Sequence, residues 1–86
     1  MPLVSQFFGI KIYMYWAEHY PKHFHAECGA FKVLINIDDG TVLKGHFPIK
    51  QLKLVSTWTE LHKLELLKNW DSARNLGSIL QIEPLK

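Results

Sequence analysis

The sequence predicts an α+β domain, in which a three- to four-stranded antiparallel β-meander precedes a C-terminal helix or helix pair. Two observations predict this class. Apolar and polar residues alternate in several short runs before residue 48, and a stretch without glycine or proline then extends from Ile49 to Arg74. Eighty-six residues are typical of one domain. We therefore expect a single domain (1–86) with a sheet at 1–47, a helical segment at 48–75 and a tail at 76–86.

Residues 7–17 form the first expected strand. Every second residue is apolar, and β-branched and aromatic residues are frequent, which indicates a strand half-buried against a core. The expected buried face consists of Phe8, Ile10, Ile12, Met14 and Trp16, and the opposite face carries Lys11, Tyr13 and Tyr15.

Three further strands are expected after a loop at residues 18–22, which contains Pro21. They cover residues 23–28, 31–37 and 41–47. Asp39 and Gly40 lie between the last two, and an Asp-Gly pair between apolar runs is a strong signal for a tight hairpin turn.

The helical segment begins after Pro48, because proline fits the first helical turn, and it ends before Gly77. Its apolar residues form two stripes that do not share one face. Either a break near residues 58–62 gives two helices, or one long helix packs on both the sheet and a partner. Four large residues cannot all face one sheet, and we predict that they form a partner interface in a homo-oligomer or hetero-complex. They are Trp58, Leu61, Leu66 and Trp70.

Composition and charge exclude several classes of protein. A hydrophobic content of 48% excludes disorder, and it favours a dimer or a protein partner for so small a domain. The net charge of +2 is compatible with nucleic-acid binding without requiring it. One cysteine cannot form an internal disulfide. The first residues do not have the pattern of a secretory leader and no apolar run reaches about 20 residues, so we expect neither a leader nor a membrane span. We expect a cytoplasmic protein that needs no membrane and no cofactor.

The most informative motif is the segment His23-Phe-His25-Ala-Glu27. On a strand, alternate side chains share a face, so the two imidazoles and the carboxylate point the same way, about 6.5–7 Å apart along the backbone. Such a pair can act as acid and base on a phosphodiester, because histidine titrates near neutral pH. The same residues, with His19 from the loop, can instead converge on zinc. The third interpretation is an ordinary solvated strand face.

Basic and aromatic residues are expected on the same face as this motif. A meander brings Lys11, Tyr13 and Tyr15 from the first strand beside Lys32 from the third and Lys44 from the fourth. Positive charge for the backbone and rings for stacking are what a single-stranded nucleic-acid surface requires. These five residues are therefore candidate RNA-binding residues.

Several segments of the chain form a recognisable set: Phe-Phe-Gly-Ile-Lys-Ile-Tyr-Met-Tyr at 7–15, His-Tyr-Pro-Lys-His-Phe-His-Ala-Glu at 19–27, and residues 61–62, 69–75 and 82–85. Together they resemble the small bacterial family known as domain of unknown function four-one-six-zero. The resemblance covers essentially the whole chain, although Lys22 stands where a second proline is expected and Cys28 where tyrosine is expected. Members of this family often form half of a two-gene cassette in the manner of toxin–antitoxin modules. The resemblance thus implies a toxin-like or partner-binding role, with a cognate small protein encoded nearby.

The leading functional hypothesis is a toxin-like protein that cleaves RNA without a metal ion. His23 and His25 would be the acid–base pair, Glu27 would orient an imidazole, and His19 would complete the site. Lys11 and Lys32 would hold phosphate. One alternative is a non-enzymatic module, an antitoxin or regulator, that binds a partner protein. The other is a small metal-binding protein that uses the three histidines and Glu27.

Overall fold

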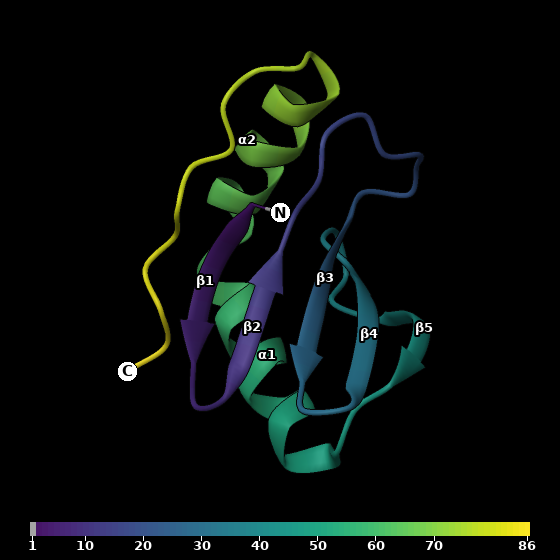
Figure 1. Cartoon of the computed structure of the whole chain (residues 1–86), viewed down its shortest axis with the longest axis vertical. Coiled ribbons are helices and arrows are strands. Elements are labelled where there is room, and N and C mark those ends of the chain that lie inside the picture. The colour runs from purple at the N-terminus through teal and green to yellow at the C-terminus, as the bar shows by residue number, and fades with distance from the viewer. Residues whose placement is uncertain (1) are drawn as a thin grey trace.

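The computed structural model describes residues 2–86 as a five-stranded antiparallel sheet with two helices packed behind it (Figure 1). The elements are β1 (Leu3–Phe7), β2 (Ile10–Tyr13), β3 (His23–Cys28), β4 (Phe31–Asn36), β5 (Val42–His46), α1 (Ile49–Leu61) and α2 (Lys63–Arg74). Each strand pairs with its neighbour in the chain, so the sheet is a meander in the order β1-β2-β3-β4-β5. The α+β class is confirmed, with five strands in place of the predicted three to four.

The additional strand comes from the N-terminal hairpin. Phe8 and Gly9 both have positive φ, at 48° and 78°, and form the two-residue turn that joins β1 to β2. The predicted strand at 7–17 is therefore shorter, and Phe8 is exposed in the turn rather than buried. Ile10 and Ile12 keep the predicted buried face, whereas Trp16 lies in the loop that follows β2.

The core lies between the sheet and the helices. Phe24 and Ala26 of β3 point into it, as do the alternate residues Val33 and Ile35 of β4. Cys28 packs at the edge of the same core, as its position in β3 predicts. The helices contribute Val55, Trp58, Leu66 and Trp70.

The helical segment breaks at His62, within the predicted window, and this break corrects the predicted partner interface. Because α2 starts on a new axis, both apolar stripes reach the core of the chain itself. Trp58, Leu66 and Trp70 are almost fully buried there, and only Leu61 of the four, at 66% exposure, remains accessible to a partner.

Neither helix of the described chain is long and apolar enough to cross a membrane.

The C-terminal tail, expected at residues 76–86, runs beside β1 as irregular chain (Figure 1). The Ile82 amide donates a hydrogen bond of 2.8 Å to the carbonyl oxygen of Val4. The side chain of Asn69 holds the tail from the other side, because its amide bonds both backbone groups of Leu80 at 2.8 and 3.0 Å. The tail therefore covers the β1 edge of the sheet.

Candidate functional site

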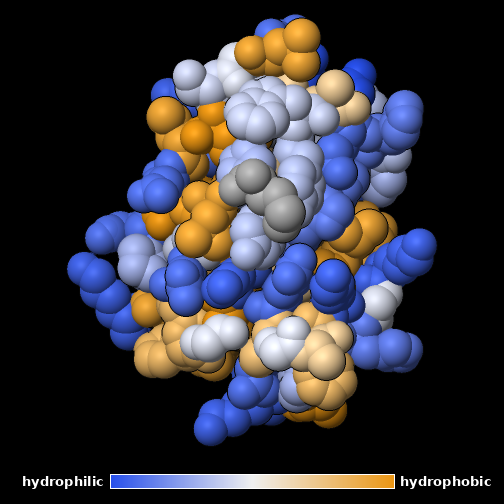
Figure 2. All heavy atoms as spheres, in the orientation of Figure 1, coloured by the Kyte–Doolittle hydropathy of each residue, from blue (hydrophilic) through white to orange (hydrophobic). Residues whose placement is uncertain are grey.

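The face of the sheet turned away from the helices, here called the open face, carries the predicted functional residues. Strand pairing arranges them in cross-strand rows, since residues directly opposite each other share a face. The rows are Lys11–Glu27–Lys32–His46, Tyr13–His25–Leu34–Lys44 and His23–Asn36. Hydrophilic residues form a band across this side of the molecule (Figure 2). The structure thus brings the predicted histidines, lysines and Tyr13 together on one surface.

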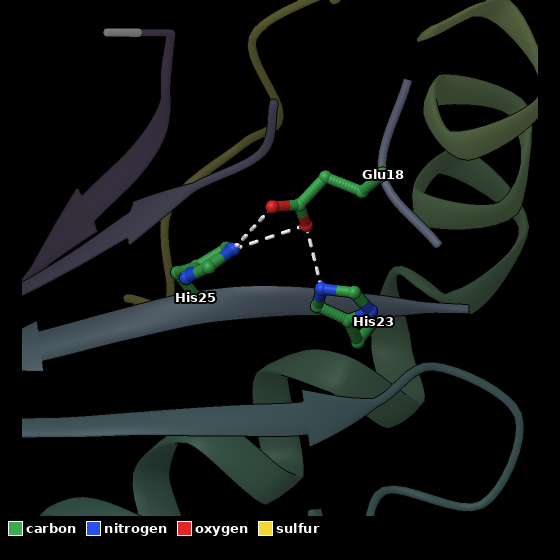
Figure 3. Close-up of side chains that lie close together, drawn as sticks. All are labelled: Glu18, His23 and His25. Carbon is green, nitrogen blue, oxygen red and sulfur yellow. Dashed lines mark hydrogen bonds and ion pairs between the residues drawn. The ribbon is translucent and has the colours of Figure 1, made fainter. Parts of the chain in front are cut away.

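Both histidines of β3 face a carboxylate that comes from the loop before the strand (Figure 3). His25 Nε2 lies 3.0 and 3.1 Å from the two carboxylate oxygens of Glu18. His23 Nε2 lies 2.5 Å from Glu18 Oε2. We call these three residues the Glu18 cluster.

The loop that carries Glu18 is fixed to the C-terminal end of α2. Arg74 donates a hydrogen bond of 2.7 Å from Nη1 to the carbonyl oxygen of Glu18. The amide of Ala17 donates to Ala73 at 3.2 Å, and the indole N–H of Trp16 donates to the carbonyl oxygen of Gly77 at 2.7 Å. Three hydrogen bonds therefore place the Glu18 carboxylate above β3.

The hydrogen bond from His23 to the backbone fixes which ring nitrogen faces Glu18. Nδ1 of His23 lies 2.7 Å from the carbonyl oxygen of Pro21, and a carbonyl only accepts, so Nδ1 carries the hydrogen. In the neutral ring, Nε2 then presents a lone pair to the Glu18 carboxylate. Two acceptors at 2.5 Å repel each other unless a proton or a metal ion lies between them. A proton or a metal ion shared by Nε2 and the carboxylate would relieve this repulsion.

Aromatic rings surround the cluster and fix the imidazoles. The rings of Tyr15 and His25 form a T-shaped pair with centroids 4.7 Å apart, and the His23 ring packs on Trp70 at a centroid distance of 5.2 Å. Burial, followed by the negative charge of Glu27, raises the pKa of the Tyr15 phenol above its usual value. Tyr15 therefore remains a neutral ring beside the cluster at physiological pH.

Glu27 does not have the role that the sequence suggested. It lies between Lys11 and Lys32 in the strand register, and the carboxylate that contacts the imidazoles belongs to Glu18. His19 is exposed in the loop and is not among the three converging groups. Sequence reasoning missed Glu18 because strand periodicity does not predict the direction of a loop side chain.

Two hollows on the open face give access to the cluster. One has a volume of about 690 Å³ and is lined in part by Glu18, His19 and His23. The other, of about 350 Å³, is lined in part by His25 and Lys32. Leu34 and Lys44 border both hollows, so the lysine lies between the two entrances.

Comparison with known proteins identifies a family. The model of the family described as "Domain of unknown function (DUF4160)" matches residues 9–71, which include the Glu18 cluster and all five candidate RNA-binding residues. No curated protein and no solved structure shows significant similarity to the chain. The family match covers well over half of the sequence, and the chain therefore belongs to the DUF4160 family.

Proposed function

We propose that this domain is the toxin-like member of a bacterial toxin–antitoxin-type pair and that it acts on RNA through the open face. Its proposed location is the cytoplasm, and its proposed partner is a cognate small protein encoded nearby. One observation carries the RNA proposal: basic side chains, tyrosines and the Glu18 cluster share a single sheet face.

The rows of the open face suit a single-stranded nucleic acid. Lys11 and Lys32 lie in one row and Lys44 in the next, and these lysines are distributed from β2 to β5, over three strand spacings. The Tyr13 and Tyr15 rings are nearly parallel, at 15° with centroids 6.4 Å apart, and a base can extend such a stack. Phosphate contacts and stacking together give affinity with little dependence on base sequence.

The Glu18 cluster supplies the reactive groups in this proposal. His25 shares a row with Tyr13 and Lys44, so RNA bound along that row passes over the imidazole. In the proposed cleavage the ribose 2′-oxygen loses its proton and attacks the adjacent phosphorus, the bond from phosphorus to the 5′-oxygen breaks, and that oxygen takes up a proton. In this proposal, the base that accepts the 2′-proton and the acid that protonates the 5′-oxygen are groups of the Glu18 cluster. Both Nε2 atoms face Glu18, so in this proposal the Glu18 carboxylate, rather than the predicted Glu27, orients the two imidazoles.

Expression of the chain alone, and together with the product of the neighbouring gene, tests this function. We expect growth arrest with fragmented RNA when the chain is expressed alone, and recovery when the partner is present. Normal growth at a confirmed level of folded protein would contradict the toxin-like role. Arrest with intact RNA would contradict the RNA substrate and leave the open face without its proposed ligand.

A further inference from the structure

We propose that Glu18, His23 and His25 form a binding site for one divalent transition-metal ion, with Zn²⁺ as the best-matched species. The three residues offer one ligand atom each, and these atoms all lie within 4.8 Å of one another. Zinc bonds of about 2.0–2.1 Å at tetrahedral angles separate neighbouring ligand atoms by about 3.3 Å. The carboxylate oxygen lies 2.5 and 3.0 Å from the two Nε2 atoms, so the three ligand atoms already converge and have to move apart by less than about 1 Å to admit the ion.

The hydrogen bond from His23 to Pro21 prepares the ring for a metal. A histidine ligand typically donates its other N–H to a carbonyl or carboxylate, which fixes the tautomer and directs the free lone pair at the ion. His23 has this arrangement, with Nδ1 2.7 Å from the Pro21 carbonyl oxygen and Nε2 facing Glu18. A metal ion between Nε2 and the carboxylate also removes the repulsion between two acceptors.

The donor set and its surroundings select the class of ion. Two imidazoles and one carboxylate suit zinc and its first-row neighbours, whereas magnesium and calcium prefer oxygen ligands throughout. Cys28 lies toward the core side of β3, so no thiolate joins the set. The side chains of His23, Glu18 and His25 retain 11, 24 and 27% exposure, which leaves the ion open to water or substrate. Three protein ligands with an open position are typical of catalytic zinc sites.

Titration of the chelator-treated, full-length chain with Zn²⁺ in a calorimeter tests the site without RNA. We expect one ion per chain. Glu18→Gln and His25→Ala should each lower the affinity for Zn²⁺ by more than about 100-fold. Loss of a residue that only hydrogen-bonds to a ligand typically lowers metal affinity by about 10- to 100-fold, and loss of the ligand itself should lower it further. Titration with Co²⁺ should give visible absorption bands that change in both variants, since these bands report the coordinating atoms.

His62→Ala is the matched control. His62 Nδ1 lies 2.6 Å from Glu65 Oε1, so this pair offers a histidine and a carboxylate but lies outside the three-group cluster. Its removal should leave affinity and stoichiometry unchanged, and circular dichroism should confirm that all variants fold. The proposal is overturned if the wild-type chain shows no saturable binding below millimolar Zn²⁺, or if Glu18→Gln and His25→Ala bind as tightly as the wild type. The cluster would then be a hydrogen-bonded group without a metal ion, and the RNA proposal would still stand on its own test.

Discussion

His25→Ala is expected to abolish growth arrest and RNA degradation by the expressed chain without unfolding it. His25 connects the Glu18 cluster to the row that carries Tyr13 and Lys44. Its side chain lies on the open face, so its removal deletes little core packing. Loss of a positioned acid or base typically lowers a rate by about 10²–10⁴-fold. Growth curves and the integrity of total RNA, at matched protein levels, provide the measurement.

Phe24→Ala is the control that distinguishes a loss of catalysis from a loss of folding. Phe24 is the neighbour of His25 in β3, but it is fully buried on the opposite face. Its truncation should lower the free energy of unfolding by about 3–5 kcal/mol. That variant should therefore lose activity together with its thermal transition, whereas His25→Ala should keep the transition. Full activity in His25→Ala would remove the cluster from the proposed reaction.

Trp58→Ala is expected to lower the free energy of unfolding by about 3–5 kcal/mol, as much as Phe24→Ala. Trp58 is fully buried and packs against Phe7 and Phe24, with ring centroids 5.5 and 5.7 Å away. Its indole N–H also donates a hydrogen bond of 2.8 Å to the carbonyl oxygen of Glu83, which anchors the tail. Because small domains have only about 5–15 kcal/mol of total stability, this loss is a large share. Urea denaturation followed by circular dichroism measures it.

Leu61→Ala provides the comparison, because Leu61 is predominantly exposed and belongs to the same predicted interface. Its substitution should change the free energy of unfolding by less than about 0.5 kcal/mol. Equal losses for the two variants would contradict the burial of Trp58 within a single chain and restore the prediction that these residues face a partner.

Local patterns predicted most of the fold. The alternation in β3 correctly assigned Phe24 to the core and the histidines to the other face, and the drift of the apolar stripe located the helix break. The N-terminal hairpin was missed because Phe8 continues the apolar alternation, while the backbone of Phe8 and Gly9 turns with positive φ. An alternating pattern does not reveal a two-residue turn when a large apolar residue occupies it.

The candidate site was predicted only in part, for a similar reason. The histidine pair follows from strand periodicity, but the position of Glu18 depends on hydrogen bonds from Arg74 and to Ala73, more than 50 residues later in the chain. No local pattern encodes such contacts. Three of the four residues of the predicted partner interface lie in the core of the chain itself, because the break at His62, one of the two arrangements that the sequence allows, lets Leu66 and Trp70 join Trp58 there.

Nuclear magnetic resonance of the isotope-labelled chain, titrated with a single-stranded oligoribonucleotide, tests most directly whether the open face is the functional surface. We expect shift changes centred on Tyr13, His25, Lys32 and Lys44, with none at the exposed Leu61. Lys32→Ala combined with Lys44→Ala should weaken binding and reduce the slope of log affinity against log salt by about 1.4, or about 0.7 per phosphate contact. Shift changes confined to α1 and α2, or no changes at millimolar oligonucleotide, would contradict the account.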